Sequence, residues 1–154
     1  MIEYRKATID DIEELLKVRM AVLYEVEHIF TAEQEAALLA PNREYILNGL
    51  ADGSFAEWLA VEDNKIIGTS SVSFYLLPPT TTRPNGKTAY IGNMFTYPEY
   101  RGRGIGSQLL SLATEEAKLA GCNELRLNAT DAGRPIYQKF GFKCNDNAMI
   151  YYIN

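Results

Sequence analysis

The chain has 154 residues and a formal net charge of −5, and 47% of its residues are apolar. This length allows one domain with a buried core and excludes two domains of ordinary size. No apolar run approaches the roughly 20 residues of a membrane-spanning helix, and no cluster of Lys and Arg supplies the basic face that nucleic-acid binding needs.

The cysteine and histidine content argues against a metal site. Cys122, Cys144 and His28 are far apart in the sequence, which fits neither a zinc pattern nor a disulfide framework. The first residues lack the apolar core of a signal peptide. We therefore expect a single domain over residues 1–154, a cytoplasmic location, and no metal, nucleic acid or membrane as a partner.

A short strand and a long helix are expected at the N-terminus. Residues 2–6 alternate between apolar and polar side chains, as a strand does. Thr8 stands three residues before Asp11, an arrangement that resembles a capping box. Apolar residues then recur at helical spacing from Ile12 to Val26, which predicts a first helix of roughly four turns.

Two shorter helices are expected next, with a proline between them. Thr31 and Gln34 form a second capping signal. It opens a short helix that Pro41 closes, because proline has no backbone N–H. Asn42 is expected to cap a further helix over residues 43–51.

The middle of the chain predicts strands. Residues 57–62 and 65–77 flank a turn at Asp63 and Asn64 and predict an antiparallel hairpin. Residues 88–97 form a third strand, rich in β-branched and aromatic side chains.

The C-terminal part alternates helices and strands. A helix over residues 105–120 has one apolar face, and a strand at 124–129 and a short helix at 134–140 follow. Residues 142–144 and 149–153 predict a terminal pair of strands. The whole order indicates an α+β (mixed α/β) fold with one central sheet.

The most informative stretch is YRGRGIGSQLL at residues 100–110. Counted from Arg101, it has the spacing R-x-x-G-x-G, and an amphipathic helix follows. Glycine lets the backbone approach a ligand without a Cβ in the way, and a helix N-terminus offers unpaired N–H groups to an anion. The loop therefore predicts a phosphate or pyrophosphate site. The alternative is a tight turn that only starts the helix.

The spacing argues against two common nucleotide motifs. No Gly-Lys-Ser/Thr follows the glycines, so the loop is not a Walker A loop. Gly102, Gly104 and Gly106 are evenly spaced and follow antiparallel strands, which does not match the dinucleotide fingerprint. ATP, GTP and NAD are weaker ligand hypotheses, and a nucleotide-binding protein stays open as a rival.

Two segments in this order resemble one known family. The R-x-x-G-x-G loop follows a strand, and the segment IYQKFGF at 136–142 comes after it, with one helix and one strand between them. This arrangement resembles the GNAT superfamily of acyl-CoA-dependent N-acyltransferases, and the resemblance covers essentially the whole chain. It implies a central, mostly antiparallel sheet that is flanked by helices and splayed between the strands at 88–97 and 124–129.

The resemblance also implies how the cosubstrate acetyl-CoA would bind. Its pantetheine arm would lie in the opening of the sheet, and the amide of Phe95 or Met94 would face the thioester carbonyl. Its pyrophosphate would lie on the amides of the glycine loop, with Arg103 a better phosphate ligand than Arg101. The expected cofactor-binding residues are Met94, Phe95, Thr96, Arg101, Gly102, Arg103, Gly104, Ile105, Gly106, Ser107 and Asn128.

Three of these residues have a plainer alternative. Arg101 would otherwise form a surface ion pair, for example with Glu99. Ser107 would only cap the helix, and Asn128 would be an ordinary polar residue at a strand end rather than a ligand of cofactor or substrate.

The implied reaction is direct attack of a primary amine on the acetyl thioester, without a covalent acyl-enzyme. Tyr137 matches the family's tyrosine in the segment before Phe140, Gly141 and Phe142. It is expected to donate a hydrogen bond or proton to the leaving thiolate, and its alternative role is packing.

No general base is assigned. Relatives often carry a glutamate on one of the two splayed strands, whereas this chain has Gly-Asn at 92–93 and Arg-Leu-Asn at 126–128. Glu25, Glu27 and His28 follow the first helix and would act through water, with a solvated surface position as the alternative.

These features together predict an N-acetyltransferase that moves an acetyl group from acetyl-CoA to a primary amine of a small molecule or peptide. An acyl-CoA-binding sensor on the same fold is the alternative, because no base is assigned. No motif encodes the acceptor, and the net charge of −5 is compatible with a polyamine, an aminoglycoside or a lysine side chain. Similar proteins often pair, so a homodimer is expected by analogy.

Overall fold

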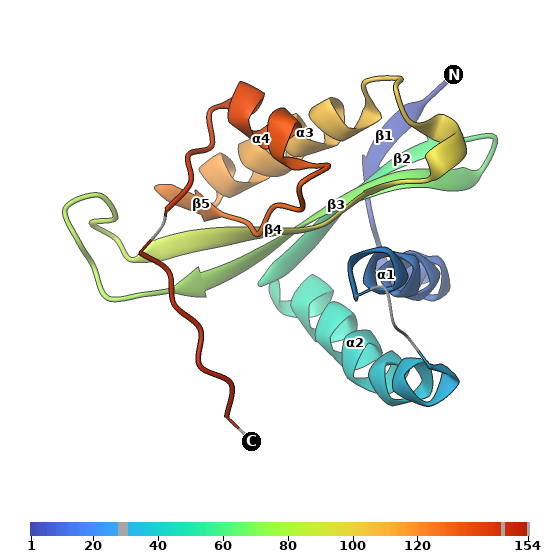
Figure 1. The fold of residues 1–154 in the computed structure, drawn as a ribbon, viewed down its shortest axis with the longest axis horizontal. Coiled ribbons are helices and arrows are strands. Elements are labelled where there is room, and N and C mark those ends of the chain that lie inside the picture. Colours follow the sequence, from blue (N-terminus) through green and yellow to red (C-terminus); the bar gives the residue numbers. More distant parts are fainter. Residues whose placement is uncertain (28–30, 146, 154) are drawn as a thin grey trace.

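The computed structural model describes residues 1–27, 31–145 and 147–153 (Figure 1). One five-stranded sheet has the order β1-β2-β3-β4-β5. None of the described helices is long and apolar enough to span a membrane. The elements in chain order are β1 (Glu3–Lys6), the 3₁₀ turn η1 (Ile9–Asp11), α1 (Ile12–Glu27), α2 (Ala32–Asp52), β2 (Phe55–Glu62), β3 (Lys65–Leu76), β4 (Lys87–Thr96), the 3₁₀ turn η2 (Pro98–Tyr100), α3 (Ile105–Leu119), β5 (Glu124–Arg126) and α4 (Arg134–Phe140).

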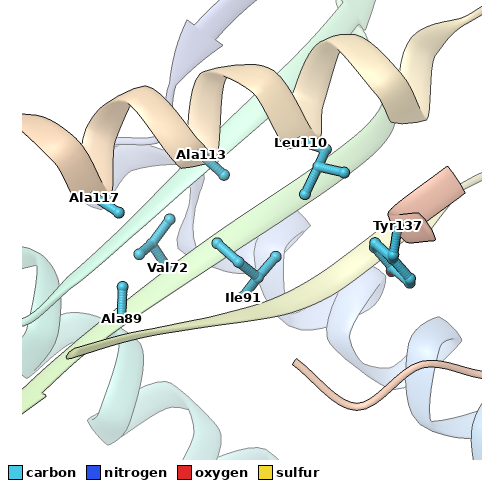
Figure 2. Close-up of a cluster of buried hydrophobic side chains, with 7 residues drawn as sticks. All are labelled: Val72, Ala89, Ile91, Leu110, Ala113, Ala117 and Tyr137. Carbon is cyan, nitrogen blue, oxygen red and sulfur yellow. The ribbon is translucent and has the colours of Figure 1, made fainter. Parts of the chain in front are cut away.

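Helices cover both faces of the sheet. Figure 1 shows α1 and α2 on one face and α3 and α4 on the other. Inward-facing residues alternate along the strands, so the two faces build separate cores. Phe55 and Leu59 of β2 pack with Leu15, Leu16 and Ile46 of the first helix layer. On the other face, side chains of β3 and β4 pack beneath α3 and α4 (Figure 2), and this cluster comprises Val72, Ala89, Ile91, Leu110, Ala113, Ala117 and Tyr137.

The sheet confirms the predicted fold class and the predicted opening. The first three strand pairs are antiparallel, whereas β4 and β5 are parallel. That parallel pairing involves only Thr88 to Tyr90 of β4, yet β4 continues to Thr96. The second half of β4 therefore leaves one edge without a strand partner. The strand predicted at 124–129 ends at Arg126, which widens this opening.

The prediction of two helices separated by Pro41 is wrong, because α2 is one helix with Pro41 inside it. The capping box at Thr31 and Gln34 is present, and the helix ends at Gly53. Asn42 does not cap a helix. Its side-chain amide donates to the carbonyl of Leu38 at 2.8 Å. A proline removes one helical hydrogen bond, and packing of Ile46 in the core keeps the following turns in place.

The predicted strands at 142–144 and 149–153 are also wrong. The described residues after α4 form no strand, and residues 147–153 extend away from the sheet (Figure 1). The side chains from Met149 to Ile153 are between 74% and 95% exposed. β-branched and aromatic residues favour a strand only when a neighbouring strand pairs with them, and no described segment of the chain does so here.

Candidate functional site

A β-bulge interrupts β4 at the beginning of the opening. Thr69 of β3 pairs with Phe95, and Ser71 pairs with Gly92, so one residue of β3 faces two residues of β4, Asn93 and Met94. Asn93 has a φ of +46°, a region that asparagine tolerates better than most residues. The Thr69 hydroxyl donates to the Asn93 carbonyl at 2.8 Å. The bulge turns the backbone that follows, and bulges often lie beside active sites for this reason.

The glycine loop presents a row of unpaired backbone donors. Gly102 and Gly104 have φ values of +79° and +78°, which only glycine adopts without strain. The first hydrogen bond at the start of α3 runs from the Gln108 amide to the Gly104 carbonyl at 3.1 Å. Among the described residues, no acceptor is found for the six consecutive amides of residues 102–107. Such a row at a helix N-terminus is a strong anion site.

These amides border a cavity of about 440 Å³, here called the first cavity. It lies where the glycine loop, the free half of β4 and the first turns of α3 and α4 meet α1. Nine of the eleven predicted cofactor-binding residues line it, together with Tyr137. The nine are Met94, Phe95, Thr96, Arg101, Gly102, Gly104, Ile105, Gly106 and Ser107.

The two arginines of the loop differ in their relation to the first cavity. Arg101 lines the first cavity, where it donates to the Thr96 carbonyl at 2.8 Å and to both oxygens of Glu25 at 2.9 and 2.8 Å. Arg103 lies outside the cavity lining, and both of its terminal nitrogens bind Glu62 at 3.0 and 2.7 Å. Of the two, Arg101 is therefore the one that lines the first cavity, and its ion-pair partner is Glu25 instead of Glu99. Asn128 also lies outside the lining.

Tyr137 projects from α4 to the wall of the first cavity, and it is 9% exposed. Its ring packs edge-on against Phe142, with 6.0 Å between the centroids. Gly133 makes room for this ring, because a Cβ there would lie 3.2 Å from it. Burial raises the pKa of the Tyr137 hydroxyl, and nearby Tyr90 raises it further. The hydroxyl is therefore protonated near neutral pH and available as a donor.

A second cavity, of about 200 Å³, lies between α1, α2 and the strands β3 and β4. Asn93 lines the second cavity, and the next residue, Met94, lines the first. The two cavities also share α1, since Arg19 lines one and Val22, one turn later, lines the other. They therefore approach each other at the bulge.

A buried polar network that the sequence reasoning missed supports the bulge. Asn93 donates to Glu57 Oε1 at 3.2 Å and accepts from Arg19 Nη1 at 2.8 Å. Glu57 is 1% exposed, and its second oxygen has no partner among the described residues. Burial raises the pKa of Glu57 from 4.5 to about 7, against the lowering effects of Asn93, Arg19 and Thr69. A sequence signal existed, because Glu57 alternates with the core residues Phe55 and Leu59 along one strand face.

The described residues offer no obvious general base. Glu25 is the one carboxylate that lines either cavity in the described part of the chain, and Arg101 binds both of its oxygens. Glu27 is exposed. His28, the third residue considered, lies outside the described residues. The described residues also contain no group of three or more His, Cys, Asp or Glu side chains that could hold a metal ion.

Comparison with known proteins agrees with this geometry. The model of the acetyltransferase (GNAT) family matches residues 20–142. A predicted acetyltransferase from Clostridium acetobutylicum, solved with acetyl-CoA, is 36% identical with a TM-score of 0.90, over 99% of this chain and 96% of that one. A GCN5-related N-acetyltransferase from Ralstonia eutropha JMP134 is 31% identical with a TM-score of 0.88, over 99% of both chains.

Curated relatives match over shorter stretches. The glucosamine 6-phosphate N-acetyltransferase of Trypanosoma brucei brucei is 28% identical over 85 residues, which is 55% of this chain and 56% of that protein. The thialysine N-epsilon-acetyltransferase of Bos taurus is 41% identical over 46 residues, which is 30% of this chain and 27% of that protein. The matched part therefore spans between about a quarter and just over half of these relatives.

Proposed function

The chain belongs to the acetyltransferase (GNAT) family, and on that basis we propose that it moves an acetyl group from acetyl-CoA to a primary amine. The observation that carries this proposal is the row of six unpaired amides at residues 102–107, which borders the first cavity. A diphosphate supplies several acceptor oxygens and two or more negative charges, which is what such a row binds best.

The first cavity continues from this row along the edge of β4 that β5 leaves unpaired, where Met94, Phe95 and Thr96 line it. The pantetheine arm carries two amide groups, and main-chain groups at an open strand edge suit them. The solved Clostridium acetobutylicum relative was crystallised with acetyl-CoA, which is consistent with this assignment. Arg101 would add one positive charge near the phosphates if it gave up one of its two hydrogen bonds to Glu25.

The chemistry that these residues supply is stabilisation of charge. In direct attack, negative charge develops first on the thioester oxygen and then on the leaving sulfur. The amide of Phe95 or Met94 is proposed to donate to that oxygen. The Tyr137 hydroxyl is proposed to donate to the sulfur, since its raised pKa keeps the proton in place until the thiolate forms.

The attacking amine has to be neutral, and the second cavity favours that form. We propose that the amine reaches the thioester from this cavity, because Asn93 and Met94 connect the two cavities at the bulge. Partial burial and the positive charge of Arg19 both lower the pKa of an amine that enters. Proton loss to water before attack would then replace a dedicated base.

An acyl-CoA-binding sensor remains a second candidate, because neither cavity is lined by a described carboxylate free to act as base. Release of free thiol from acetyl-CoA, measured across a panel of amines, separates the two. A blank without amine is needed, since Cys144 is an exposed free thiol. Amine-dependent release together with an acetylated product supports the enzyme. Binding of CoA without any acetylated amine supports the sensor, and thermal stabilisation by ATP but not by CoA would overturn both.

We also propose that the chain forms a homodimer. The apolar side chains from Met149 to Ile153 are almost fully exposed in one copy, and contiguous exposed apolar surface of this kind usually marks an interface. The outer edge of β5 pairs with no other strand of the described chain. In a symmetric pair, the extended segment at residues 149–153 of each copy can pack against the open β5 edge of the other copy.

A further inference from the structure

The second cavity has a polar lining with an unusual charge balance. Its described lining includes the hydroxyls of Tyr45, Ser71, Ser73 and Tyr90, the side-chain amides of Asn42 and Asn93, and one charged group, Arg19. Tyr45 donates to the Ser73 oxygen at 2.7 Å, so the Ser73 proton is free to point to a ligand. No described carboxylate lines this cavity. A cationic polyamine would therefore find no counter-charge here.

Arg19 is held in one orientation by two asparagines. Its Nε donates to Asn42 Oδ1 at 3.0 Å, and its Nη1 donates to Asn93 Oδ1 at 2.8 Å. Both asparagines have their NH₂ groups engaged elsewhere, Asn42 on the Leu38 carbonyl and Asn93 on Glu57. Their oxygens are thereby directed to the guanidinium. The remaining nitrogen, Nη2, has no hydrogen-bond partner among the described residues.

Arg19 also differs from every other arginine of the chain in its charge partner. The other seven arginines each form an ion pair with an Asp or Glu, and these are Arg5, Arg43, Arg83, Arg101, Arg103, Arg126 and Arg134. Within the described residues Arg19 forms none. Asn93 hydrogen-bonds both Arg19 and Glu57, and the charge of Arg19 lowers the pKa of Glu57 without an ion pair between the two side chains in the described residues. A half-buried guanidinium without an ion-pair partner binds an oxyanion well, because no carboxylate occupies its donors.

We propose that Arg19 binds an oxyanion of the acceptor, so that the acceptor is a small amine that also carries a carboxylate or a phosphate. This inference rests on the proposed function and assigns the substrate class to the same site. Nη2, with the hydroxyls of Ser71 and Ser73, supplies the donors for the oxyanion. The amine of the same molecule then points across the bulge, where Asn93 and Met94 connect the two cavities, toward the thioester. Gly92 leaves the space beside the Ser71 hydroxyl open, since a Cβ there would lie 3.2 Å from Ser71 Oγ.

Matched acceptors test the inference. Lysine and cadaverine differ by one carboxylate, and glucosamine 6-phosphate and glucosamine differ by one phosphate, so the two pairs also distinguish the two oxyanions. The wild-type protein is expected to have a kcat/KM at least about tenfold higher for the acidic member of one pair, as for a charge-assisted hydrogen bond. The proposal would be overturned if cadaverine and glucosamine, the members without an acidic group, each gave a kcat/KM equal to or higher than that of their acidic counterpart.

Variants of Arg19 test whether this side chain causes the preference for the acidic acceptor. Arg19→Gln should reduce the preference of the favoured pair to within about twofold, while calorimetry shows CoA binding unchanged, because Arg19 lines only the second cavity. Arg43→Gln, in an exposed ion pair with Glu13, is the matched control and should keep the preference. If Arg19→Gln does not fold, Arg19→Lys is the second variant. Lysine retains the positive charge but lacks the planar guanidinium with its paired N–H donors, so this variant should keep part of the preference for the acidic acceptor.

The outcomes separate the two proposals. A preference that survives in folded Arg19→Gln overturns the role of Arg19 and leaves the acetyltransferase intact. If the wild-type protein acetylates only amines that carry no acidic group, the role of Arg19 is likewise overturned and the acetyltransferase remains intact. If CoA binds and no amine in the panel is acetylated, the proposed function fails, and the substrate class fails with it.

Discussion

Replacing Glu57 by glutamine should remove a loss of folding stability that the wild type undergoes between pH 4 and pH 8. Glu57 is fully buried, and its pKa is raised from 4.5 to about 7 in the folded chain. Below pH 4.5 the side chain is protonated in both the folded and the unfolded state and contributes no pH dependence. Between pH 4.5 and about pH 7, Glu57 loses its proton in the unfolded chain but keeps it in the folded chain. The wild type therefore loses stability as the pH rises.

The size of this loss follows from the two pKa values. Each pKa unit corresponds to 1.36 kcal/mol, so the free energy of unfolding should fall by about 3 kcal/mol between pH 4 and pH 8 because of Glu57 alone. Glutamine keeps an oxygen that can accept from Asn93 but does not titrate. The substitution can also change the free energy of unfolding by an amount that does not depend on pH. That amount cancels, because the prediction concerns only the difference between pH 4 and pH 8.

Urea unfolding of the two proteins at several pH values measures this difference. The free energy of unfolding of the variant, relative to the wild type, should rise by about 3 kcal/mol from pH 4 to pH 8. Glu44→Gln is the matched control, because Glu44 is exposed, and its curve should run parallel to the wild type. Parallel curves for Glu57→Gln as well would refute the reasoning and show that Glu57 titrates normally.

Three further predictions concern the site and the assembly. Tyr137→Phe should lower kcat about tenfold or more, at the low end of general-acid effects, with little change in the Kd of CoA; unchanged turnover would remove Tyr137 from the chemistry. Gly106→Ala should weaken CoA binding in calorimetry without lowering Tm, because among the described residues the added Cβ meets only Ile136, at 3.7 Å, whereas it would lie beside the proposed path of the cofactor; an unaltered Kd would contradict that path. Analytical ultracentrifugation should show a dimer for the wild type and a monomer for Ile150→Asp, whereas a monomeric wild type would disprove the proposed pairing.

Local patterns in the sequence were enough to predict most elements and the loop. The glycine spacing before α3 and the caps at Thr31 and Gly53 act over a few residues, so a single chain segment reveals them. Tertiary packing decided the cases that failed. Pro41 lies inside α2 because the helix continues into a buried face, and residues 149–153 form no strand because the described chain offers them no partner.

The candidate site was predictable only in its local parts. Residues 102–107 are consecutive, so the motif alone was enough to predict that their amides are available to a ligand. Arg19, Glu57 and Asn93 come from α1, β2 and β4, and no spacing rule connects them. The choice between Arg101 and Arg103 also depended on distant partners, Glu25 and Glu62. Glu57 alone left a usable signal, as a carboxylate at an inward position of a buried strand.

A crystal structure of the chain with acetyl-CoA bound tests the central claim most directly. The account predicts diphosphate oxygens within hydrogen-bond distance of several of the six amides from Gly102 to Ser107, which have no acceptor among the described residues. A well-ordered acetyl-CoA whose diphosphate lies elsewhere, with those amides bound only by water, would contradict it.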